Sequence, residues 1–345
     1  MTPQTKLLFV CGNGGVGKTS CAVGMAIALA QHGKKTMVLT IDPARRLADA
    51  LHIQLHNNDI QSVALQTTST PIDAMMLDAK TVLHKFAQRH SSPQKWQTLE
   101  QNTYFQFATE KMGSIQEMMA IVQIMELLAS QKYTHIIVDT PPAQNAVDFF
   151  TSPQKIEALF SHKVLEWLGS HSTGWRGVQL GKTILTKGLG LMLGEKTVQE
   201  MGDFFQAFQE VAIELGKYAH ECNIQLHLPH TEYWIISNRT RNPHHMEKFR
   251  NELLSLSLPV QGIVYNKDPL PFPHLEKIET PNAQVTNTIE QMRRQYHTLY
   301  PPIETTPMAT PIYSIAKASL ESLQDMEEWA KQFHAIAKNI IDIEK

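Results

Sequence analysis

The sequence is poor in cysteine and lacks long hydrophobic runs. Its 345 residues include three cysteines, Cys11, Cys21 and Cys222, without C-x-x-C spacing. This argues against a disulfide framework or a zinc site. No apolar stretch approaches the roughly 20 residues that span a bilayer. The first apolar run breaks at Gly12 into a glycine-rich loop, which is not typical of a signal peptide. These absences favour a cytoplasmic protein without a transmembrane segment.

An excess of charge of either sign is also missing. The formal net charge is −2, which gives no reason to expect nucleic acid or an acidic membrane surface as a partner. Histidines are scattered, and the adjacent pair His244 and His245 is a poor metal site because neighbouring helical side chains diverge by about 100°. The chain is long enough for one large α/β domain or two moderate ones.

What the sequence does contain is a glycine-rich loop. Residues 12–20 read G-N-G-G-V-G-K-T-S directly after the apolar run 6–11, and they fit the phosphate-loop pattern G-x-x-x-x-G-K-[ST]. We expect Gly12, Gly14, Gly15 and Gly17 to permit backbone conformations that a β-carbon would block. The loop N–H groups can then point at phosphate oxygens. The helix predicted from position 19 to about 32 directs its positive dipole end at the same anion.

This motif predicts binding of ATP or ADP with Mg²⁺. Lys18 is expected to neutralise the β- and γ-phosphates and to act in catalysis, and the Thr19 hydroxyl to ligate the metal. The expected nucleotide contacts are Gly14, Gly15, Val16, Gly17, Lys18, Thr19 and Ser20. A second G-K-T at 181–183 lacks the upstream glycines, and we interpret it as a coincidence.

Strand-like apolar runs alternate with helical patterns along the chain. Strands are predicted at 6–11, 35–41, 72–77, 133–138, 233–236, 261–265 and 304–308, and a terminal helix at about 314–341. Such alternation favours an α/β fold with a doubly wound, mainly parallel sheet covered on both faces. We expect one domain over 1–345. The helical blocks at about 78–131 and 150–228 are predicted to form an inserted helical subdomain.

Three polar residues follow predicted strands, where open α/β sheets bind ligands. Asp42 is placed to orient the water that attacks the γ-phosphate, although a helix-capping role before Pro43 is an alternative. Asp139 ends a buried strand. An unpaired charge is costly there, so we expect it to hold Mg²⁺. Asn266 has a donor and an acceptor that suit the edge of adenine, and a plain turn asparagine is the alternative.

Together with T-I-D-P-A-R-R-L-A-D-A-L at 40–51 and V-D-T-P-P at 138–142, these motifs resemble the ArsA-type ATPase family. That family includes arsenite-pump and tail-anchored-protein targeting ATPases, and the resemblance covers nearly the whole chain. It implies a phosphate-loop ATPase fold, Mg²⁺-ATP hydrolysis and a dimer with nucleotides at its interface. By this resemblance Asp42 is the switch I residue, Asp139 the switch II residue and Asn266 the adenine contact. Pro311, in the loop after the last predicted strand, is a further adenine candidate.

The sequence departs from the family at Asn13, where many members have a lysine that reaches the partner subunit's phosphate. A cation supplied in trans can be worth roughly 10³–10⁵ in rate, so we expect slow hydrolysis. Arg45 or Arg46 is a candidate for supplying the charge within the chain, or else both lie on a solvated helix. Pairing with a paralogue that retains the lysine is another route, so homodimer and heterodimer both stay open.

Family members differ in what they handle besides nucleotide. Arsenite pumps bind metalloid through a cysteine cluster that this sequence lacks, so arsenite transport is not expected. The Met- and Leu-rich segment at about 179–218 is a candidate groove for hydrophobic client proteins, with plain hydrophobic core as the alternative. The alternative function is therefore a slowly hydrolysing, nucleotide-dependent adaptor or chaperone.

Overall fold

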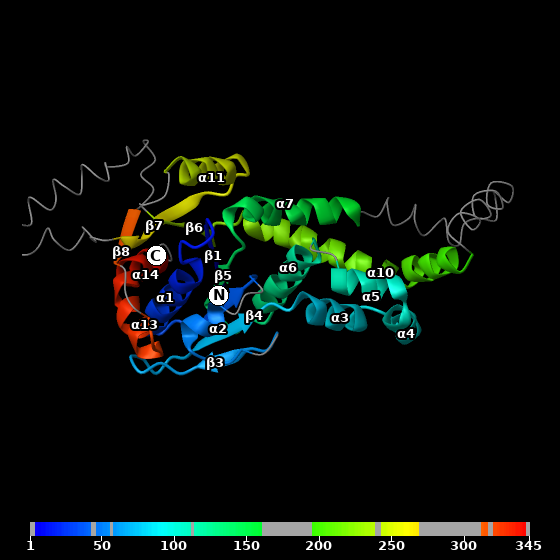
Figure 1. Ribbon diagram of the computed structural model, residues 1–345, viewed down its shortest axis with the longest axis horizontal. Coiled ribbons are helices and arrows are strands. Elements are labelled where there is room, and N and C mark those ends of the chain that lie inside the picture. The colour runs from blue at the N-terminus through cyan, green and yellow to red at the C-terminus, as the bar shows by residue number, and fades with distance from the viewer. Residues whose placement is uncertain are drawn as a thin grey trace, which may run out of the picture.

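The computed structural model describes residues 4–42, 46–55, 58–111, 114–160, 195–238, 243–268, 312–316 and 320–342. These residues form one eight-stranded sheet with the order β3-β4-β2-β5-β1-β6-β7-β8 (Figure 1). The strands are β1 (Lys6–Gly12), β2 (Thr36–Thr40), β3 (Gln61–Val63), β4 (Ile72–Met76), β5 (His135–Asp139), β6 (Thr231–Ser237), β7 (Val260–Asp268) and β8 (Ile312–Ala316). Neighbouring strands are parallel except for β3 and β4. The predicted α/β fold with a mainly parallel sheet is confirmed.

Both faces of this sheet are covered. Residues of β1 are buried along its whole length, and successive side chains alternate between two hydrophobic clusters. Leu8 and Val10 pack with α1 (Lys18–Gln31), α2 (Arg46–Leu51), α13 (Leu323–Ala330) and α14 (His334–Asp342). Leu7 and Phe9 belong to the cluster on the opposite face. Continuous apolar strands of this kind are typical of parallel sheets buried on both faces, so the doubly wound arrangement is also confirmed.

The second face is covered by helices, most of which continue beyond the sheet, on the right of Figure 1. They are α3 (Ala79–Arg89), α4 (Pro93–Gln101), α5 (Thr103–Lys111), α6 (Ser114–Ala129), α7 (Ala143–Leu159), α10 (Glu195–Leu226) and α11 (Pro243–Ser255). The long helix α10 contacts α3, α4, α5, α6 and α7. Their apolar residues share one cluster with the sheet. Residues 161–194 of the predicted helical block lie outside the described residues, and the subdomain boundaries stay a prediction.

Two edge strands differ from the prediction. Strand β3 was not expected, and β8 occupies 312–316 at the start of the helix predicted for 314–341. That helix begins instead at Leu323. Its N-cap is Ser322, whose side chain accepts a hydrogen bond from the Asp325 N–H. A short apolar run fits a strand or a helix equally well, and parallel pairing of β8 with β7 decides for the strand. The strand predicted at 304–308 lies outside the described residues.

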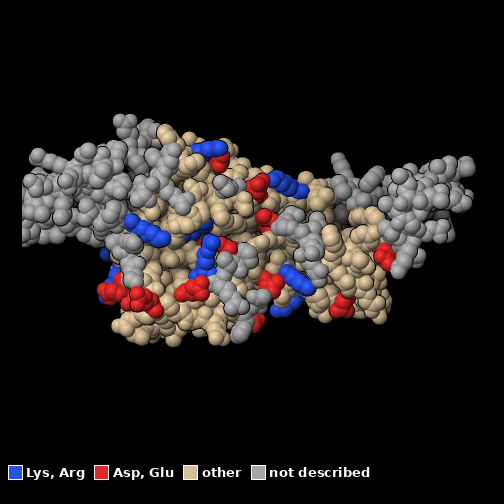
Figure 2. Space-filling view, in the orientation of Figure 1, with Lys and Arg blue, Asp and Glu red and all other residues tan. Residues whose placement is uncertain are grey.

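On the face shown in Figure 2, basic and acidic side chains are interspersed among the described residues. Among these same residues, none of the helices combines the length and the apolar character that crossing a membrane requires.

Candidate functional site

The loop between β1 and α1 needs glycine at three positions. Gly12, Gly15 and Gly17 have φ angles of 149°, 78° and 88°, which residues with a β-carbon adopt rarely. A Cβ on Gly12 would lie 2.2 Å from the Ile236 carbonyl oxygen, and one on Gly17 would lie 2.2 Å from the Asn266 Nδ2. Gly14 is different, because it has no positive φ and a Cβ there would meet no atom within 4 Å. The expectation that Gly14 is needed for backbone conformation is therefore wrong.

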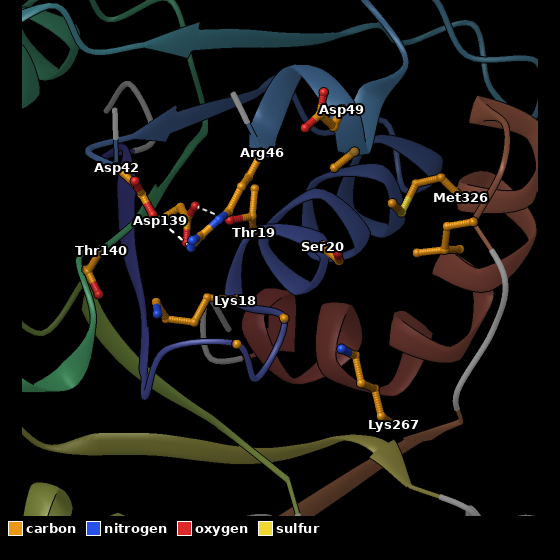
Figure 3. A pocket seen from close by; sticks show the side chains of 14 residues that line it. Lys18, Thr19, Ser20, Asp42, Arg46, Asp49, Asp139, Thr140, Lys267 and Met326 are labelled. Carbon is orange, nitrogen blue, oxygen red and sulfur yellow. Dashed lines mark hydrogen bonds and ion pairs between the residues drawn. The ribbon is translucent and has the colours of Figure 1, made fainter. Parts of the chain in front are cut away.

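Helix α1 begins directly after this loop without a side-chain cap. Its N-cap is Gly17 in the left-handed conformation, so no side chain competes for the N–H groups of the first turn. An uncapped helix N-terminus of this kind favours an anion. In front of it lies a cavity of about 370 Å³ (Figure 3). Seven residues predicted to contact nucleotide or metal, or to act in catalysis, line it: Gly15, Gly17, Lys18, Thr19, Ser20, Asp42 and Asp139.

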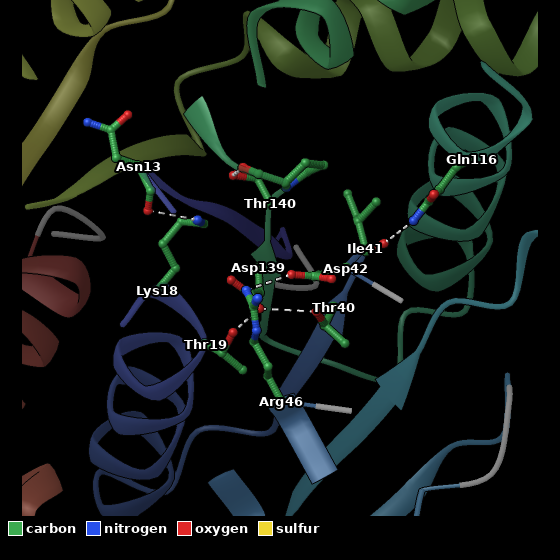
Figure 4. A network of polar contacts seen from close by, with 11 residues as sticks. Asn13, Lys18, Thr19, Thr40, Ile41, Asp42, Arg46, Gln116, Asp139 and Thr140 are labelled. Carbon is green, nitrogen blue, oxygen red and sulfur yellow. Dashed lines mark hydrogen bonds and ion pairs between the residues drawn. The ribbon is translucent and has the colours of Figure 1, made fainter. Parts of the chain in front are cut away.

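Asp139 is brought to this cavity by the register of the sheet. Parallel pairing places it beside Val10 of β1 and Thr40 of β2. Its Oδ2 accepts hydrogen bonds from the hydroxyls of Thr19 at 2.6 Å and Thr40 at 3.1 Å (Figure 4). The two residues that the motif assigned to Mg²⁺ are thus in direct contact, although 120 positions separate them in the sequence.

The second oxygen of Asp139 has no hydrogen-bond partner. The residue is 1% exposed, and its Oδ1 is buried and unbonded. Burial raises the pKa of this carboxyl to about 6, while Thr19, Lys18 and Thr40 act in the opposite direction. A buried unsatisfied carboxylate oxygen is costly, and oxygen atoms are the ligands that Mg²⁺ prefers. The pair Thr19 and Asp139 therefore fits a divalent cation.

Lys18 is turned back onto its own loop. Its Nζ donates a hydrogen bond of 3.3 Å to the carbonyl oxygen of Asn13, as Figure 4 shows. Burial lowers the pKa of the Lys18 ammonium, and the Asp139, Cys11 and Asp42 side chains counteract this. The ammonium lies at the cavity wall, where phosphate oxygens offer a stronger acceptor than a neutral carbonyl.

Asp42 follows the end of β2 and pairs with Arg46. The Arg46 Nη1 is 3.0 Å from the Asp42 Oδ2, and both residues line the cavity. The Gln116 side chain of α6 donates to the carbonyl oxygen of Ile41, the residue before Asp42. The helical block therefore contacts the backbone of this segment directly (Figure 4). Arg45, the other arginine considered, lies outside the described residues.

The structure places Asn266 against the phosphate loop and not at the cavity. Its Nδ2 donates to the Val16 carbonyl oxygen at 2.9 Å, and its Oδ1 accepts from the Lys267 N–H at 2.8 Å. The side chain is buried and so is that of Val16, and neither residue lines the cavity. An adenine contact by Asn266 stays a prediction. Pro311 lies outside the described residues and precedes β8, so it does not follow the last strand.

A comparison with known families places the glycine loop and the acidic residues of the site in one matched region of the chain. A family model with the description "Anion-transporting ATPase" matches residues 5–214, which include the glycine loop, Asp42 and Asp139. The chain belongs to the anion-transporting ATPase family.

Individual relatives of this family are distant. The chain is 25% identical to the ATPase GET3C of Arabidopsis thaliana over 173 residues, which cover 46% of this chain and 44% of that protein. It is 24% identical to the ATPase GET3 of Rhodotorula glutinis over 262 residues, covering 76% of this chain and 70% of that protein. It is 29% identical to the ATPase ARSA2 of Chlamydomonas reinhardtii over 166 residues, 47% of this chain and 42% of that protein. The match thus spans less than half of two of these relatives.

The cavity wall of this anion-transporting ATPase family member also contains residues that the sequence motifs did not predict. They are Asp49, Ala50, Thr140, Lys267, Leu320 and Met326. Leu320 and Met326 come from the segment that leads into α13 and from α13 itself, far along the chain. Lys267 could have been found from the sequence, because it directly follows Asn266 at the end of a predicted strand.

Proposed function

We propose that this chain is a cytoplasmic, Mg²⁺-dependent ATPase that hydrolyses ATP slowly and works as a nucleotide-driven dimeric switch. The observation that supports this best is the buried Asp139 carboxylate. One of its oxygens is held by Thr19 and the other has no partner. Membership of the ATPase family agrees with this reading.

The predicted residues at the cavity each have a role in this proposal. The N–H groups of Gly15, Gly17 and the first turn of α1 bind phosphate oxygens, and the Lys18 ammonium leaves the Asn13 carbonyl to neutralise them. Thr19 and Asp139 hold Mg²⁺, which when bound offsets the negative charge of the phosphate groups. Ser20 lies at the same helix end and lines the cavity.

Asp42 is proposed to orient the attacking water, and Arg46 to supply the charge that Asn13 lacks. The ion pair between them holds Arg46 at the cavity within the same chain. The Arg46 side chain is 58% exposed, so it has room to turn from Asp42 toward a phosphate. A cation of this type stabilises the charge of the transition state.

The central experiment measures Mg²⁺-ATP binding and turnover of the wild type, of Lys18→Ala and of Lys155→Ala. Lys155 is an exposed lysine on α7 that pairs with Asp148, and its loss should change neither quantity. Lys18→Ala should abolish turnover and weaken ATP binding. Equal, near-zero turnover in all three proteins with intact ATP binding would favour the adaptor. Absence of ATP binding by the wild type would refute the proposal.

The dimer is tested separately by light scattering with and without a non-hydrolysable ATP analogue. A nucleotide-dependent doubling of mass supports a homodimer switch. A mass that stays monomeric with bound analogue contradicts it, and a doubling only after addition of a paralogue indicates the heterodimer.

A client-binding adaptor or chaperone is the second candidate, because large apolar side chains are exposed on the helical block. Phe107 on α5 is 58% exposed, and Phe205 on α10 is 44% exposed. Most of the apolar residues of α10, such as Val211 and Leu215, face the core. This agrees with the alternative interpretation of the Met- and Leu-rich segment as plain hydrophobic core. Residues 179–194 of the candidate groove lie outside the described residues. Nucleotide-dependent binding of a hydrophobic peptide, reduced in Phe107→Ser, would support this function.

The cysteines give no support for metalloid handling. Cys11, Cys21 and Cys222 lie on β1, α1 and α10, and each is buried. Burial raises the pKa of the Cys11 thiol to about 12, which keeps it protonated and a poor ligand. We therefore propose that this family member does not pump arsenite.

A further inference from the structure

Lys267 occupies an unusual position at the end of β7. Its φ angle is 57°, in the left-handed region that residues with a long side chain rarely adopt. Such a conformation is strained and persists where surrounding contacts hold it. The side chain is exposed and lines the cavity in front of the phosphate loop.

The contacts that hold Lys267 come from Asn266. The Asn266 Oδ1 accepts the Lys267 N–H at 2.8 Å, and its Nδ2 donates to the Val16 carbonyl at 2.9 Å. One buried amide thus joins the end of β7 to the phosphate loop. Any β-carbon at position 17 would collide with this amide, so Gly17 makes the close approach of the two segments possible.

This attachment brings the Lys267 side chain close to the loop. Its Cε lies 4.0 Å from the point where a Cβ of Gly17 would stand. Figure 3 shows Lys267 on the other side of the loop and of the start of α1 from Asp42 and Asp139. Leu320 and Met326 line the same cavity. The cavity therefore has two cations, Lys18 and Arg46, near Asp42 and Asp139, and another, Lys267, away from these carboxylates.

We propose that Lys267 is a further phosphate-binding cation, in addition to Lys18 and Arg46, and that it contacts the phosphate nearest the nucleoside. The inference rests on the proposed nucleotide-binding function. With the terminal phosphate at Lys18, Asp42 and Arg46, the chain of phosphates leads past Gly17 toward Lys267. ATP and ADP share the phosphate next to the nucleoside, so the contact contributes equally to both. The hydrogen bond from the Lys267 N–H to the Asn266 Oδ1 holds Lys267 in the position for this contact.

The test compares dissociation constants of ADP and ATP for the wild type, Lys267→Met, Lys267→Arg and Lys155→Met by calorimetry at two salt concentrations. Methionine keeps the aliphatic length and removes the charge. We expect Lys267→Met to weaken both nucleotides by about tenfold, with a smaller salt dependence, because one charge-assisted contact is lost. Lys267→Arg should retain most of the affinity, and Lys155→Met should match the wild type.

Three results would overturn the inference. The first is an unchanged nucleotide affinity in Lys267→Met, and the second is a loss of affinity for ATP alone. The third is a loss of affinity in Lys267→Ala that is absent in Lys267→Met, which would show that the aliphatic part of Lys267 packs against the base. Failure of the proposed function looks different, since then the wild type and Lys155→Met bind neither nucleotide. Thermal unfolding of each variant verifies that this exposed substitution leaves the fold intact.

Discussion

The Thr19 hydroxyl donates a 2.6 Å hydrogen bond to the Asp139 carboxylate, which joins the first turn of α1 to the end of β5. This contact keeps one carboxylate oxygen occupied and leaves the other unbonded at the cavity. A buried carboxylate with one unbonded oxygen destabilises the unliganded protein. Changes at Asp139 should therefore alter the free energy of unfolding.

The first prediction concerns pH. Burial holds the pKa of Asp139 at about 6, against an ordinary value of 3.8. The folded chain therefore binds this proton more readily than the unfolded chain, and the associated stability is present at low pH and lost as pH rises through about 6. Asp139→Asn should raise the free energy of unfolding at pH 8 by up to about 3 kcal/mol, and by about half as much at pH 5. Urea unfolding at both values measures this.

The control for this variant is Asp148→Asn, because Asp148 is an exposed carboxylate on α7. It should change stability little at either pH. Asp139→Asn should also lose the Mg²⁺ dependence of nucleotide affinity. A variant that is equally destabilised at both pH values, and still responds to Mg²⁺, would contradict the assigned role.

The second prediction concerns the Arg46 guanidinium beside Asp42. Arg46→Ala should lower ATP turnover about tenfold to a hundredfold with little change in nucleotide affinity, since the cation acts mainly in the transition state. Arg89→Ala is the matched control, because Arg89 pairs with Glu126 on the helical block and does not line the cavity. Single-turnover kinetics separates the two quantities. Equal turnover in both variants would remove Arg46 from the mechanism.

The third prediction concerns two glycines of the same loop. Gly17→Ala places a β-carbon 2.2 Å from the Asn266 amide at a φ of 88°. It should destabilise the protein by about 1–3 kcal/mol and weaken ATP binding. Gly14→Ala has open space around it and should leave stability nearly unchanged. Thermal unfolding of the pair tests this, and similar midpoints for both variants would show that the close contact is unimportant.

The fourth prediction concerns a buried glutamate that anchors α13. The Glu327 carboxylate accepts the N–H groups of Gln66 and Thr67 at 2.9 and 2.7 Å and is 1% exposed. Glu327→Ala leaves both donors without their partner and should cost about 3 kcal/mol. The neighbouring Glu328 is exposed and pairs with Lys331, three residues along the same segment, so Glu328→Ala should cost less than about 1 kcal/mol. Denaturant unfolding distinguishes them, and equal losses would argue against the buried contact.

Much of the site was predictable because it depends on local order along the chain. The glycine loop is contiguous, and its conformation follows from residue types that accept positive φ. Asp42 and Asp139 could be placed because carboxyl ends of parallel strands meet at one edge of a sheet. Alternating apolar runs were sufficient to predict the class of fold.

Tertiary structure decided the contacts between segments distant in the sequence. Thr19 meets Asp139 because of strand register, and Asn266 lies on Val16 although 250 positions separate them. An asparagine near the end of a strand has the same local sequence whether it faces a ligand or another loop. Likewise β8 is a strand because β7 lies beside it. The sequence by itself determined which groups are present and which local conformations they accept. Packing of the assembled sheet determined which of those groups meet, because a hydrogen bond depends on distance in space and not on distance along the chain.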